Sequence, residues 1–325
     1  MMRDVALGLM PGVIVLTLSY GVVVPFQLMI GVASALAAEA CALKVRGRSL
    51  SRLLDGSALV TGLLLALSLP PSAPWWAGLT GAALALLFGK HVYGGLGQNP
   101  FNPAMLGYAL LLLAFPREMT LWPAAPGLFP DEGASFSGSL AAFFQGSEAA
   151  MDAMARATPL TQLHEQWRGH VPATPEPPGN AMRWAVLNLA YLMGGLYLWR
   201  RGIIDYRIPS GILVGSLGAL ALDFWIQPSP PAPAWPLLDL FLGASMMGAF
   251  FIATDPVSAA GTPMGRWIYG AGIGFLMILI RHHGAYPDGL AFAVLIMNFV
   301  APTLDRYTRP SIFGNSSEIS KAPRA

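Results

Sequence analysis

Long apolar stretches, separated by short segments rich in glycine, proline or polar residues, recur along most of the chain. A helix of about 20 apolar residues is long enough to cross a hydrocarbon core about 30 Å thick. The pattern therefore predicts an all-α integral membrane protein with about ten transmembrane helices. The predicted spans are residues 4–20, 22–43, 54–70, 75–91, 102–116, 183–199, 208–226, 236–254, 267–281 and 285–303.

The spacing of these spans divides the chain into four parts. Residues 1–116 and 183–305 each hold five spans and form two membrane halves. Residues 117–182, the only long polar segment, are predicted to form an external loop between the halves. Residues 306–325 are expected to form a polar tail.

Composition agrees with a membrane protein and excludes several functions. Hydrophobic residues make up 54% of the chain and charged residues 11%, against roughly 25% charged in soluble domains. The single cysteine, Cys41, excludes an internal disulfide and a Cys-ligated iron–sulfur cluster. The net charge of +2 gives no indication of nucleic-acid binding, because the basic residues follow the topology.

Basic residues predict the orientation of the chain. With a cytoplasmic N-terminus, 14 of the 19 Lys and Arg residues fall in cytoplasmic segments, as the positive-inside rule requires. The sequence therefore predicts a bacterial inner-membrane protein with both termini cytoplasmic and the loop at 117–182 periplasmic.

A segment rich in helix breakers lies between the fourth and fifth spans, at residues 94–103. Irregular backbone at membrane depth is tolerated only where it is buried in protein or lines a wet cavity. The segment is either a plain surface turn or a binding loop, and its amide side chains favour binding because they offer donors and acceptors without charge. These amides are Gln98, Asn99 and Asn102.

A short internal repeat connects the two halves. Residues 62–73 align with residues 248–259 at an offset of 186, with four identities and one Ser/Thr exchange. The two segments belong to spans that run in opposite directions, as an inverted repeat of two five-helix halves requires. The repeat predicts a ligand near the interface of the halves, between helix ends at 68–73 and 254–259.

Ionisable residues in the spans are few. Glu39 and Asp55 are expected to be compensated by Lys44 and Arg52, and the remaining carboxylates are expected at helix ends. Those remaining carboxylates are Asp223, Asp239 and Asp255. The histidines lack metal-ligand spacing, so His164, His170, His282 and His283 are expected at the surface.

Four ordered motifs resemble those of a known family. They are Gly94–Met105, Thr254-Asp255-Pro256-Val257, Gly284–Leu295 and Tyr307-Thr308-Arg309-Pro310. They resemble the D subunit of the Rnf complex, a membrane-bound, ion-translocating ferredoxin:NAD oxidoreductase related to the B subunit of the sodium-pumping NADH:quinone reductase. The resemblance covers the chain from about Ala37 to Pro310, and the shorter N-terminus favours the Rnf type.

The resemblance implies a covalent flavin. In this family, a threonine in the motif Asp-x-x-Ser/Thr-x-Ala-Thr carries FMN through a phosphoester. Asp152, Ala157 and Thr158 match the motif, whereas Ala155 replaces the usual Ser/Thr. The acceptor is therefore Thr158, which is expected on an exposed, flexible loop, with Arg156 and Arg168 as candidates to stabilise the phosphate or the reduced ring.

The family further implies a noncovalent riboflavin in the membrane part. Contacts are expected from Gln98, Asn99 and Asn102, and from the turn that contains Thr254 and Asp255. Expected partners are the other Rnf subunits (A, B, C, E and G), membrane lipid, and a flavin transferase for maturation. The chain is expected to act as an oxidoreductase subunit without catalysis of its own.

Two other classes of function stay open from the residues. A flavin-free secondary transporter of the inverted-repeat type would also show ten spans and broken helices. A structural anchor for a redox assembly would use the loop only for docking. Covalent flavin on Thr158 would distinguish the electron relay from both.

Overall fold

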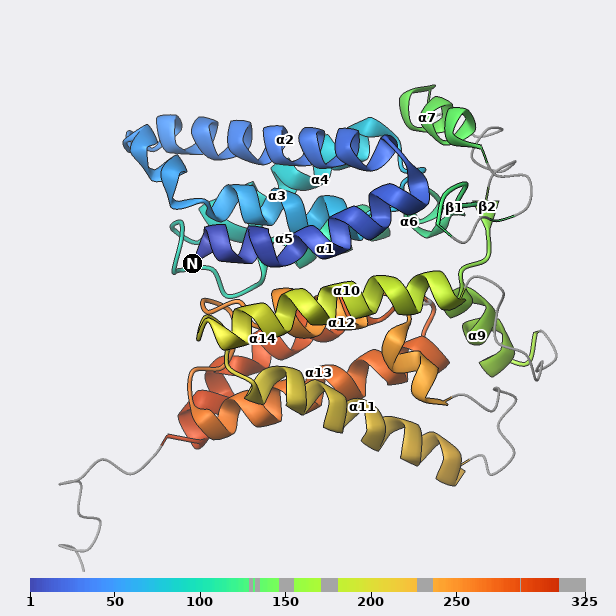
Figure 1. The fold of residues 1–325 in the computed structure, drawn as a ribbon. Coiled ribbons are helices and arrows are strands. Elements are labelled where there is room, and N and C mark those ends of the chain that lie inside the picture. The colour runs from blue at the N-terminus through green and yellow to red at the C-terminus, as the bar shows by residue number, and fades with distance from the viewer. Residues whose placement is uncertain are drawn as a thin grey trace, which may run out of the picture.

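The computed structural model describes residues 1–128, 131, 135–145, 155–170, 181–226, 236–286 and 288–309. The described residues are predominantly helical, and every predicted span coincides with a helical segment, which confirms an all-α, multi-pass membrane protein. The helices lie roughly along one common axis (Figure 1). Five of them are long and apolar enough to cross a membrane by themselves, namely Met2–Tyr20, Val23–Val45, Arg207–Ile226, Pro263–His283 and Leu290–Tyr307.

The first half contains five helical segments. They are α1 (Met2–Tyr20), α2 (Val23–Val45), α3 (Ser57–Ser68), α4 (Trp75–Leu86) with its π-helical extension Leu87–His91, and α5 (Pro103–Ala114), and a 3₁₀ turn at Leu50–Asp55 precedes α3. Local sequence sets the start of α5. Asn102 caps it by accepting a hydrogen bond from the Met105 amide, and Pro103 follows at the first helical position, where a proline loses nothing because that N–H has no partner in the helix.

The second half repeats this order. It contains α10 (Ala181–Arg200), α11 (Arg207–Ile226), a 3₁₀ turn at Pro236–Phe241, α12 (Ser245–Met247) continued by the π-helical turn Gly248–Ile252, α13 (Pro263–His283) and α14 (Leu290–Tyr307). Thr262 caps α13 in the way that Asn102 caps α5, again with a proline at the first helical position.

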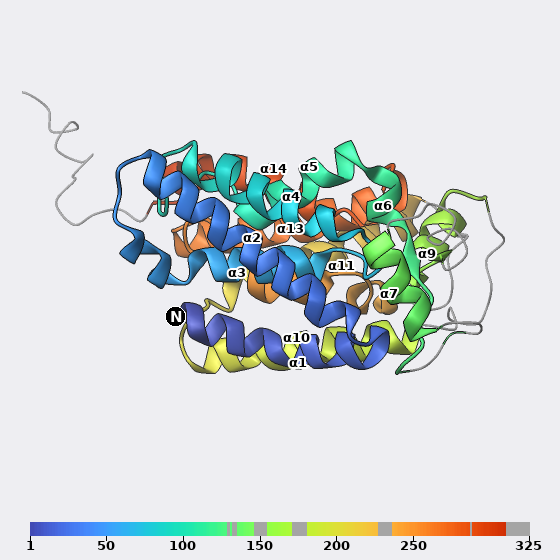
Figure 2. The same cartoon turned by 90° about the horizontal axis from the view of Figure 1, so that it is seen from above.

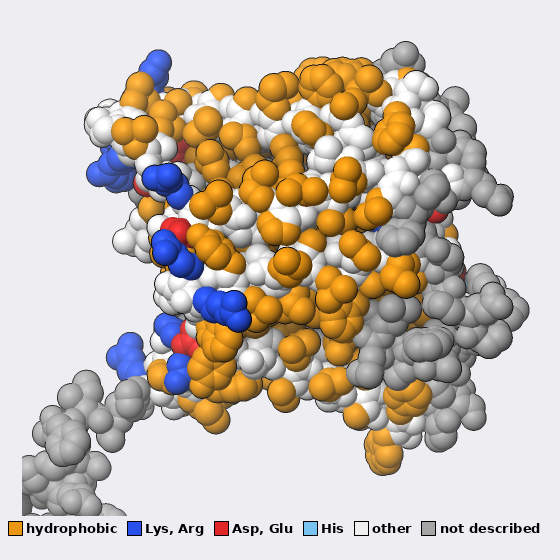
Figure 3. Space-filling model, viewed as in Figure 1, with side chains coloured by type: hydrophobic (Ala, Val, Ile, Leu, Met, Phe, Trp, Pro, Cys, Tyr) orange, Lys and Arg blue, Asp and Glu red, His pale blue; other side chains and the backbone are white. Residues whose placement is uncertain are grey.

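Small elements cover one end of the helices. They are α6 (Pro116–Thr120), β1 (Trp122–Pro123), α7 (Phe136–Gln145), β2 (Ala155–Arg156) and α9 (Pro159–Trp167). The two strands form an antiparallel pair in which Trp122 lies opposite Arg156. We call this the loop end. The opposite end carries the N-terminus and most of the visible Lys and Arg side chains (Figures 1 and 3), and we call it the basic end.

The two halves correspond at the offset of 186. Ser68 donates its hydroxyl hydrogen bond to the Leu64 carbonyl at 2.8 Å, and Thr254, 186 residues later, donates to the Phe250 carbonyl at 2.7 Å. The helical segments that end at or just before these hydroxyls are short, since α3 has 12 residues and the turn at Gly248–Ile252 has five. At 1.5 Å per residue neither crosses a membrane alone, so both are half-spans that end inside the molecule.

Helices α1 and α10, which correspond in the two halves, cross each other at the interface (Figure 2). They run antiparallel, because Asp4 bonds Arg201 at 3.2 Å while Gly12 lies against Tyr191. At the crossing, Gly8 contacts Gly194, its own counterpart at the offset of 186, and a Cβ on Gly194 would collide with the Gly8 carbonyl. A residue that meets its counterpart lies on the pseudo-two-fold axis, so the halves are inverted repeats.

Candidate functional site

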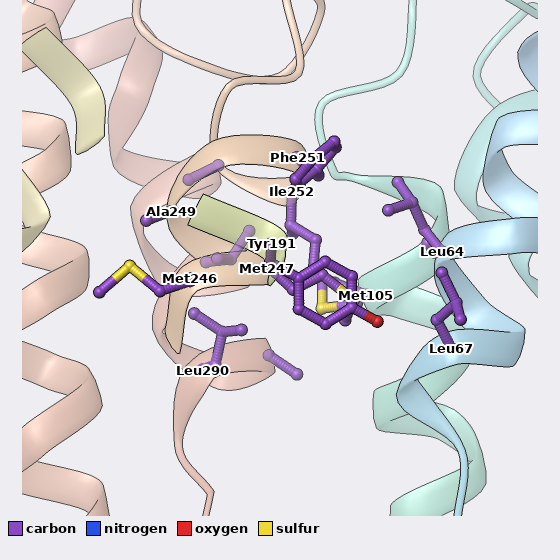
Figure 4. Packing of buried hydrophobic residues seen from close by; sticks show 14 of the residues in the cluster. Leu64, Leu67, Met105, Tyr191, Met246, Met247, Ala249, Phe251, Ile252 and Leu290 are labelled. Carbon is purple, nitrogen blue, oxygen red and sulfur yellow. The ribbon is translucent and has the colours of Figure 1, made fainter. Parts of the chain in front are cut away.

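A cavity of about 920 Å³, part of it continuous with solvent, lies between the halves near the loop end. Helices of both halves and the small loop-end elements form its walls, which include Tyr108, Trp122, Thr158, Trp184, Tyr191 and Asp288. Figure 4 shows Tyr191 between Leu64, Leu67 and Met105 of the first half and Met247 and Leu290 of the second. Ser68 lines this loop-end cavity, whereas Thr254 lines a separate cavity, so the single ligand site predicted between the helix ends at 68–73 and 254–259 is divided between two cavities.

Thr158 lies in the wall of the loop-end cavity, as the cap of α9. Its hydroxyl oxygen accepts a hydrogen bond from the Thr161 amide at 3.0 Å and lies 2.9 Å from the Thr161 hydroxyl. The residue is only 8% exposed. The expectation of an exposed, flexible threonine is therefore wrong, because α9 packs against α13 and carries its N-terminus into the protein.

The structure describes some of the residues predicted to act with Thr158 and not others. Ala157 is exposed, and its carbonyl accepts a hydrogen bond from the Gln162 side chain at 3.2 Å. Arg156 is paired through its backbone with Trp122, while its side chain and all of Asp152 lie outside the described residues. Arg168 ends α9 on the exposed surface, a helix away from Thr158.

Two groups make the loop-end cavity able to bind a polar ligand. The Tyr191 hydroxyl is buried without a hydrogen-bond partner among the described residues, and such a group is costly to leave unpaired. Trp122 and Trp184 lie edge to face with ring centroids 5.0 Å apart, so the wall offers aromatic rings for contact with a ligand. The walls therefore offer aromatic contact, a free hydroxyl and the N-terminus of α9, where anions are favoured.

A second cavity, of about 800 Å³, lies between the halves toward the basic end. Asn99, Asn102, Thr254 and Asp255 line it together. Gln98 is exposed and does not line this basic-end cavity. The buried Asn99 side-chain oxygen has no hydrogen-bond partner among the described residues, so it is free to accept one from a ligand.

A buried ion pair borders the basic-end cavity. Lys90 donates to both oxygens of Glu39 at 2.7 Å and to the Ser57 hydroxyl at 2.7 Å. Glu39 is therefore compensated by Lys90 on the π-helical turn of the neighbouring span, and the expected compensation by Lys44 is wrong. The sequence did not single out Lys90, because its partner lies 51 residues away.

The two cavities are related by the same pseudo-two-fold axis. Asn102, which lines the basic-end cavity, corresponds at the offset of 186 to Asp288, which lines the loop-end cavity. Asn102 donates to the Ile252 carbonyl at 3.2 Å, whereas Asp288 accepts from the Ala244 amide at 3.1 Å. Asn102 therefore fixes the end of the second half's half-span to the start of α5, and Asp288 fixes the residue before that half-span to the start of α14. Asn102 is the donor and Asp288 the acceptor.

A buried group of ionisable residues lies behind the loop-end cavity. His282 lies 2.6 Å from Asp223 and 2.9 Å from Asp239 and is 3% exposed, and His164 is also buried. The expectation that these histidines lie at the surface is wrong for both, while His170 and His283 are exposed. Since the partners of His282 lie 59 and 43 residues away, the run Arg281-His282-His283 at the end of an apolar span was the only signal.

Comparison with known proteins finds one family and relatives that share one description. The model of the NQR2, RnfD, RnfE family matches residues 1–314. The D subunit of the ion-translocating oxidoreductase complex of Pseudomonas aeruginosa (strain LESB58) is 47% identical over 97% of this chain and 91% of its own length. The subunits of the same description from Sodalis glossinidius and Yersinia pseudotuberculosis are each 44% identical, over 97% and 96% of this chain and 94% and 93% of their own lengths.

These matches span both halves and the loop between them, so they cover the two cavities as well as Thr158. The resemblance inferred from the motifs is thereby confirmed, and the chain belongs to the NQR2, RnfD, RnfE family of membrane proteins.

Proposed function

We propose that the chain is the D-type membrane subunit of an Rnf ion-translocating oxidoreductase and that it relays electrons through FMN bound covalently to Thr158. The observation that carries the proposal is the position of Thr158, whose hydroxyl lies in the wall of a cavity between the halves. The relatives of similar length are named as subunits of ion-translocating oxidoreductase complexes. The other Rnf subunits (A, B, C, E and G), with ferredoxin and NAD(H) as the electron partners, follow from the same proposal.

The residues around Thr158 fit a phosphoester. The hydroxyl caps α9, so a phosphate on it would lie at the helix N-terminus, where free amides and the helix dipole stabilise anions. When bound, the flavin would supply one-electron transfer. Trp122 and Trp184 would pack on the ring, and the Tyr191 hydroxyl would donate a hydrogen bond to it in the cavity.

The buried position of Thr158 changes how the modification must occur. A flavin transferase needs access to the hydroxyl, which is buried in the folded chain while α9 packs on α13. We propose that the residue is modified before α9 docks on α13, or during transient undocking. The pairing of β1 with β2 leaves Ala157 exposed beside it, which gives the transferase an adjacent segment to hold.

The basic-end cavity supports the second flavin of the proposal, a noncovalent riboflavin. Its free acceptor is the Asn99 oxygen, and Asn102, Thr254 and Asp255 provide further polar atoms in the same wall. Gln98 does not line the cavity, so its contribution rests on the sequence prediction alone.

The proposed orientation places the basic end in the cytoplasm and the loop end in the periplasm of a bacterial inner membrane. The Lys and Arg side chains at the basic end support it (Figure 3). FMN would then lie on the periplasmic side and riboflavin on the cytoplasmic side, with the crossing of α1 and α10 between them.

The covalent flavin is tested on a denaturing gel under ultraviolet light, followed by mass spectrometry of the modified peptide. We expect a fluorescent band with the added mass of FMN on Thr158 when a flavin transferase is co-expressed. Thr158→Ala should abolish the fluorescence, whereas Thr161→Ala, in the same cavity wall, should keep it. A dark wild-type band would remove the relay and favour the transporter alternative, whose inverted halves and two cavities the chain also has.

The riboflavin is tested by acid extraction of the purified chain, which releases only noncovalent flavin. We expect Asn99→Ala to lose extractable riboflavin while the covalent band persists. Gln98→Ala is the matched control and should retain both flavins. Equal retention in the two variants would place riboflavin outside the basic-end cavity.

A further inference from the structure

The buried group behind the loop-end cavity has an unusual arrangement of donors and acceptors. The His282 ring presents Nδ1 to an Asp223 oxygen at 2.6 Å and Nε2 to an Asp239 oxygen at 2.9 Å. All three side chains are at least nine-tenths buried. A neutral imidazole donates from one nitrogen only, so two ionised carboxylates would leave a nitrogen lone pair facing an oxygen lone pair.

Both hydrogen bonds of His282 can form when the three side chains together hold one further proton. With both ring nitrogens protonated, His282 donates to both carboxylates and each buried charge is paired, as buried charges require. We propose that Asp223, His282 and Asp239 form a proton-binding site at the loop end, in which an imidazolium is held between two carboxylates.

The site has a route to solvent. His283, whose side chain is 47% exposed, lies 2.9 Å from the second Asp223 oxygen. A proton can therefore pass from water to His283, then to Asp223 and to His282, through groups that each donate and accept. Trp167 of α9 covers the other side by stacking on the His282 ring, with centroids 4.1 Å apart and planes 15° apart.

The charges around His282 come from every element packed against it. They are Asp223 of α11, Asp239 of the 3₁₀ turn, Arg281 and His283 of α13, His164 of α9, and Asp288 before α14. Counted with neutral histidines, these groups carry three negative charges and one positive charge. The surroundings therefore favour an added proton.

Arg281 connects the proton site to the loop-end cavity. Its guanidinium, 1% exposed, lies 3.9 Å from an Asp239 oxygen and 3.3 Å from an Asp288 oxygen, and Asp288 lines the cavity beside Thr158. Arginine does not release its proton in proteins, so Arg281 does not transfer protons between Asp239 and Asp288. It can still transmit an electrostatic effect, because it lies between the two carboxylates. Negative charge gained in the cavity would then strengthen proton binding at His282. This coupling rests on the proposed function, because it needs a redox group in the cavity.

The site is tested by nitrogen NMR of the full chain in lipid nanodiscs with ¹⁵N-labelled histidine, which gives at most five ring systems. We expect one imidazolium with two protonated nitrogens that persists at neutral pH. His282→Gln should remove that signal, and His170→Gln, an exposed pair with Glu165, should not. Should His282→Gln fail to fold, Trp167→Ala assigns the signal through the lost ring-current shift. A neutral His282 at pH 7 would overturn the proposal.

The coupling is tested by recording the same histidine nitrogen NMR spectra at several pH values, before and after chemical reduction of the flavin-loaded chain. We expect a larger fraction of His282 to be imidazolium after reduction than before it at the same pH, because the added negative charge in the cavity attracts the proton. No change would overturn the coupling and leave the proton site in place. A Thr158→Ala chain separates the two proposals, because it should keep the imidazolium and lose its response to reduction.

Discussion

The two cavities are built on one framework and differ in the charge of the residue that begins the fifth helix of each half. In the basic-end cavity, the residue that begins α5 is the neutral Asn102, and the nearby charges Glu39 and Lys90 pair with each other. In the loop-end cavity, the corresponding residue is Asp288, and its partner is the buried Arg281. A repeated backbone thus gives two sites in matched positions, and the residue that begins the fifth helix is a neutral amide in one and a carboxylate in the other.

The crossing of α1 and α10 is the feature that both cavities share, and breaking it should have the largest effect. In Gly194→Val, the new side chain would collide with the Gly8 backbone, which cannot move aside as a side chain can. We expect a destabilisation of at least about 3 kcal/mol, seen as a lost or strongly lowered thermal midpoint by size-exclusion chromatography. Gly218→Ala, on α11 with open space around it, should leave the midpoint unchanged. Equal stability of the two variants would contradict the crossing.

The matched pair Asn102 and Asp288 gives the next largest effect and tests the difference in charge. Asp288→Asn removes a partner of buried Arg281, and we expect a cost of about 3 kcal/mol. Asn102→Asp keeps the helix cap but loses the hydrogen bond to the Ile252 carbonyl, at about 1–3 kcal/mol. Denaturant unfolding in detergent measures both changes.

The control for this pair is Asp4→Asn, which affects an ion pair with the largely exposed Arg201. We expect Asp4→Asn to leave the unfolding midpoint close to that of the wild type, because exposed ion pairs contribute little. Asp288→Asn with an effect as small as that of the control would show that the other partners of Arg281 hold it without Asp288.

The stability that Asp205 contributes at the basic end should depend on pH. Burial by itself would raise the pKa of Asp205, but hydrogen bonds from the Arg207 amide and from the Arg266 and Arg207 guanidinium groups outweigh it and hold the pKa below its ordinary value. A lowered folded-state pKa gives stability that is present above the unfolded value of about 3.9 and is lost as pH falls through the folded value.

Thermal midpoints measured between pH 7 and pH 3 check this prediction. We expect the wild type to exceed Asp205→Asn at pH 7 and the difference to shrink toward pH 3. A difference between the two midpoints that is independent of pH would contradict a lowered pKa of Asp205 in the folded chain.

The smallest effect is expected at the paired hydroxyls of the half-spans. Ser68→Ala and Thr254→Val each remove a hydrogen bond to the carbonyl four residues earlier, and side-chain hydrogen bonds in membrane proteins contribute about 0.6 kcal/mol on average. We expect similar small losses from both, because their surroundings correspond in the two halves. Unequal losses in unfolding experiments would limit the correspondence to the backbone.

The sequence predicted the spans and the repeat because both depend on local pattern. Apolar length defines α2 or α13 without knowledge of their neighbours, and the hydroxyls at Ser68 and Thr254 lie in one short alignable segment. Helix caps such as Asn102 are readable for the same reason, since the capping residue and the proline are adjacent.

The parts that the sequence missed depend on contacts between distant segments. The burial of Thr158 follows from the packing of α9 on α13, and nothing in the polar loop around it indicates that packing. Lys90 and His282 likewise gain their roles from partners 51 and 59 residues away. Long-range pairs between single polar residues leave no periodic signal in a single sequence.

The crossing of α1 on α10 also has a consequence for biosynthesis. Residues 21–180 separate the two helices, and at roughly 5–20 residues per second their synthesis takes on the order of ten seconds or more. During that interval α1 is in the membrane while the surface around Gly8 and Gly12 lacks its partner. This surface of α1 must therefore be covered by insertion factors or lipid until α10 has been synthesised and inserted.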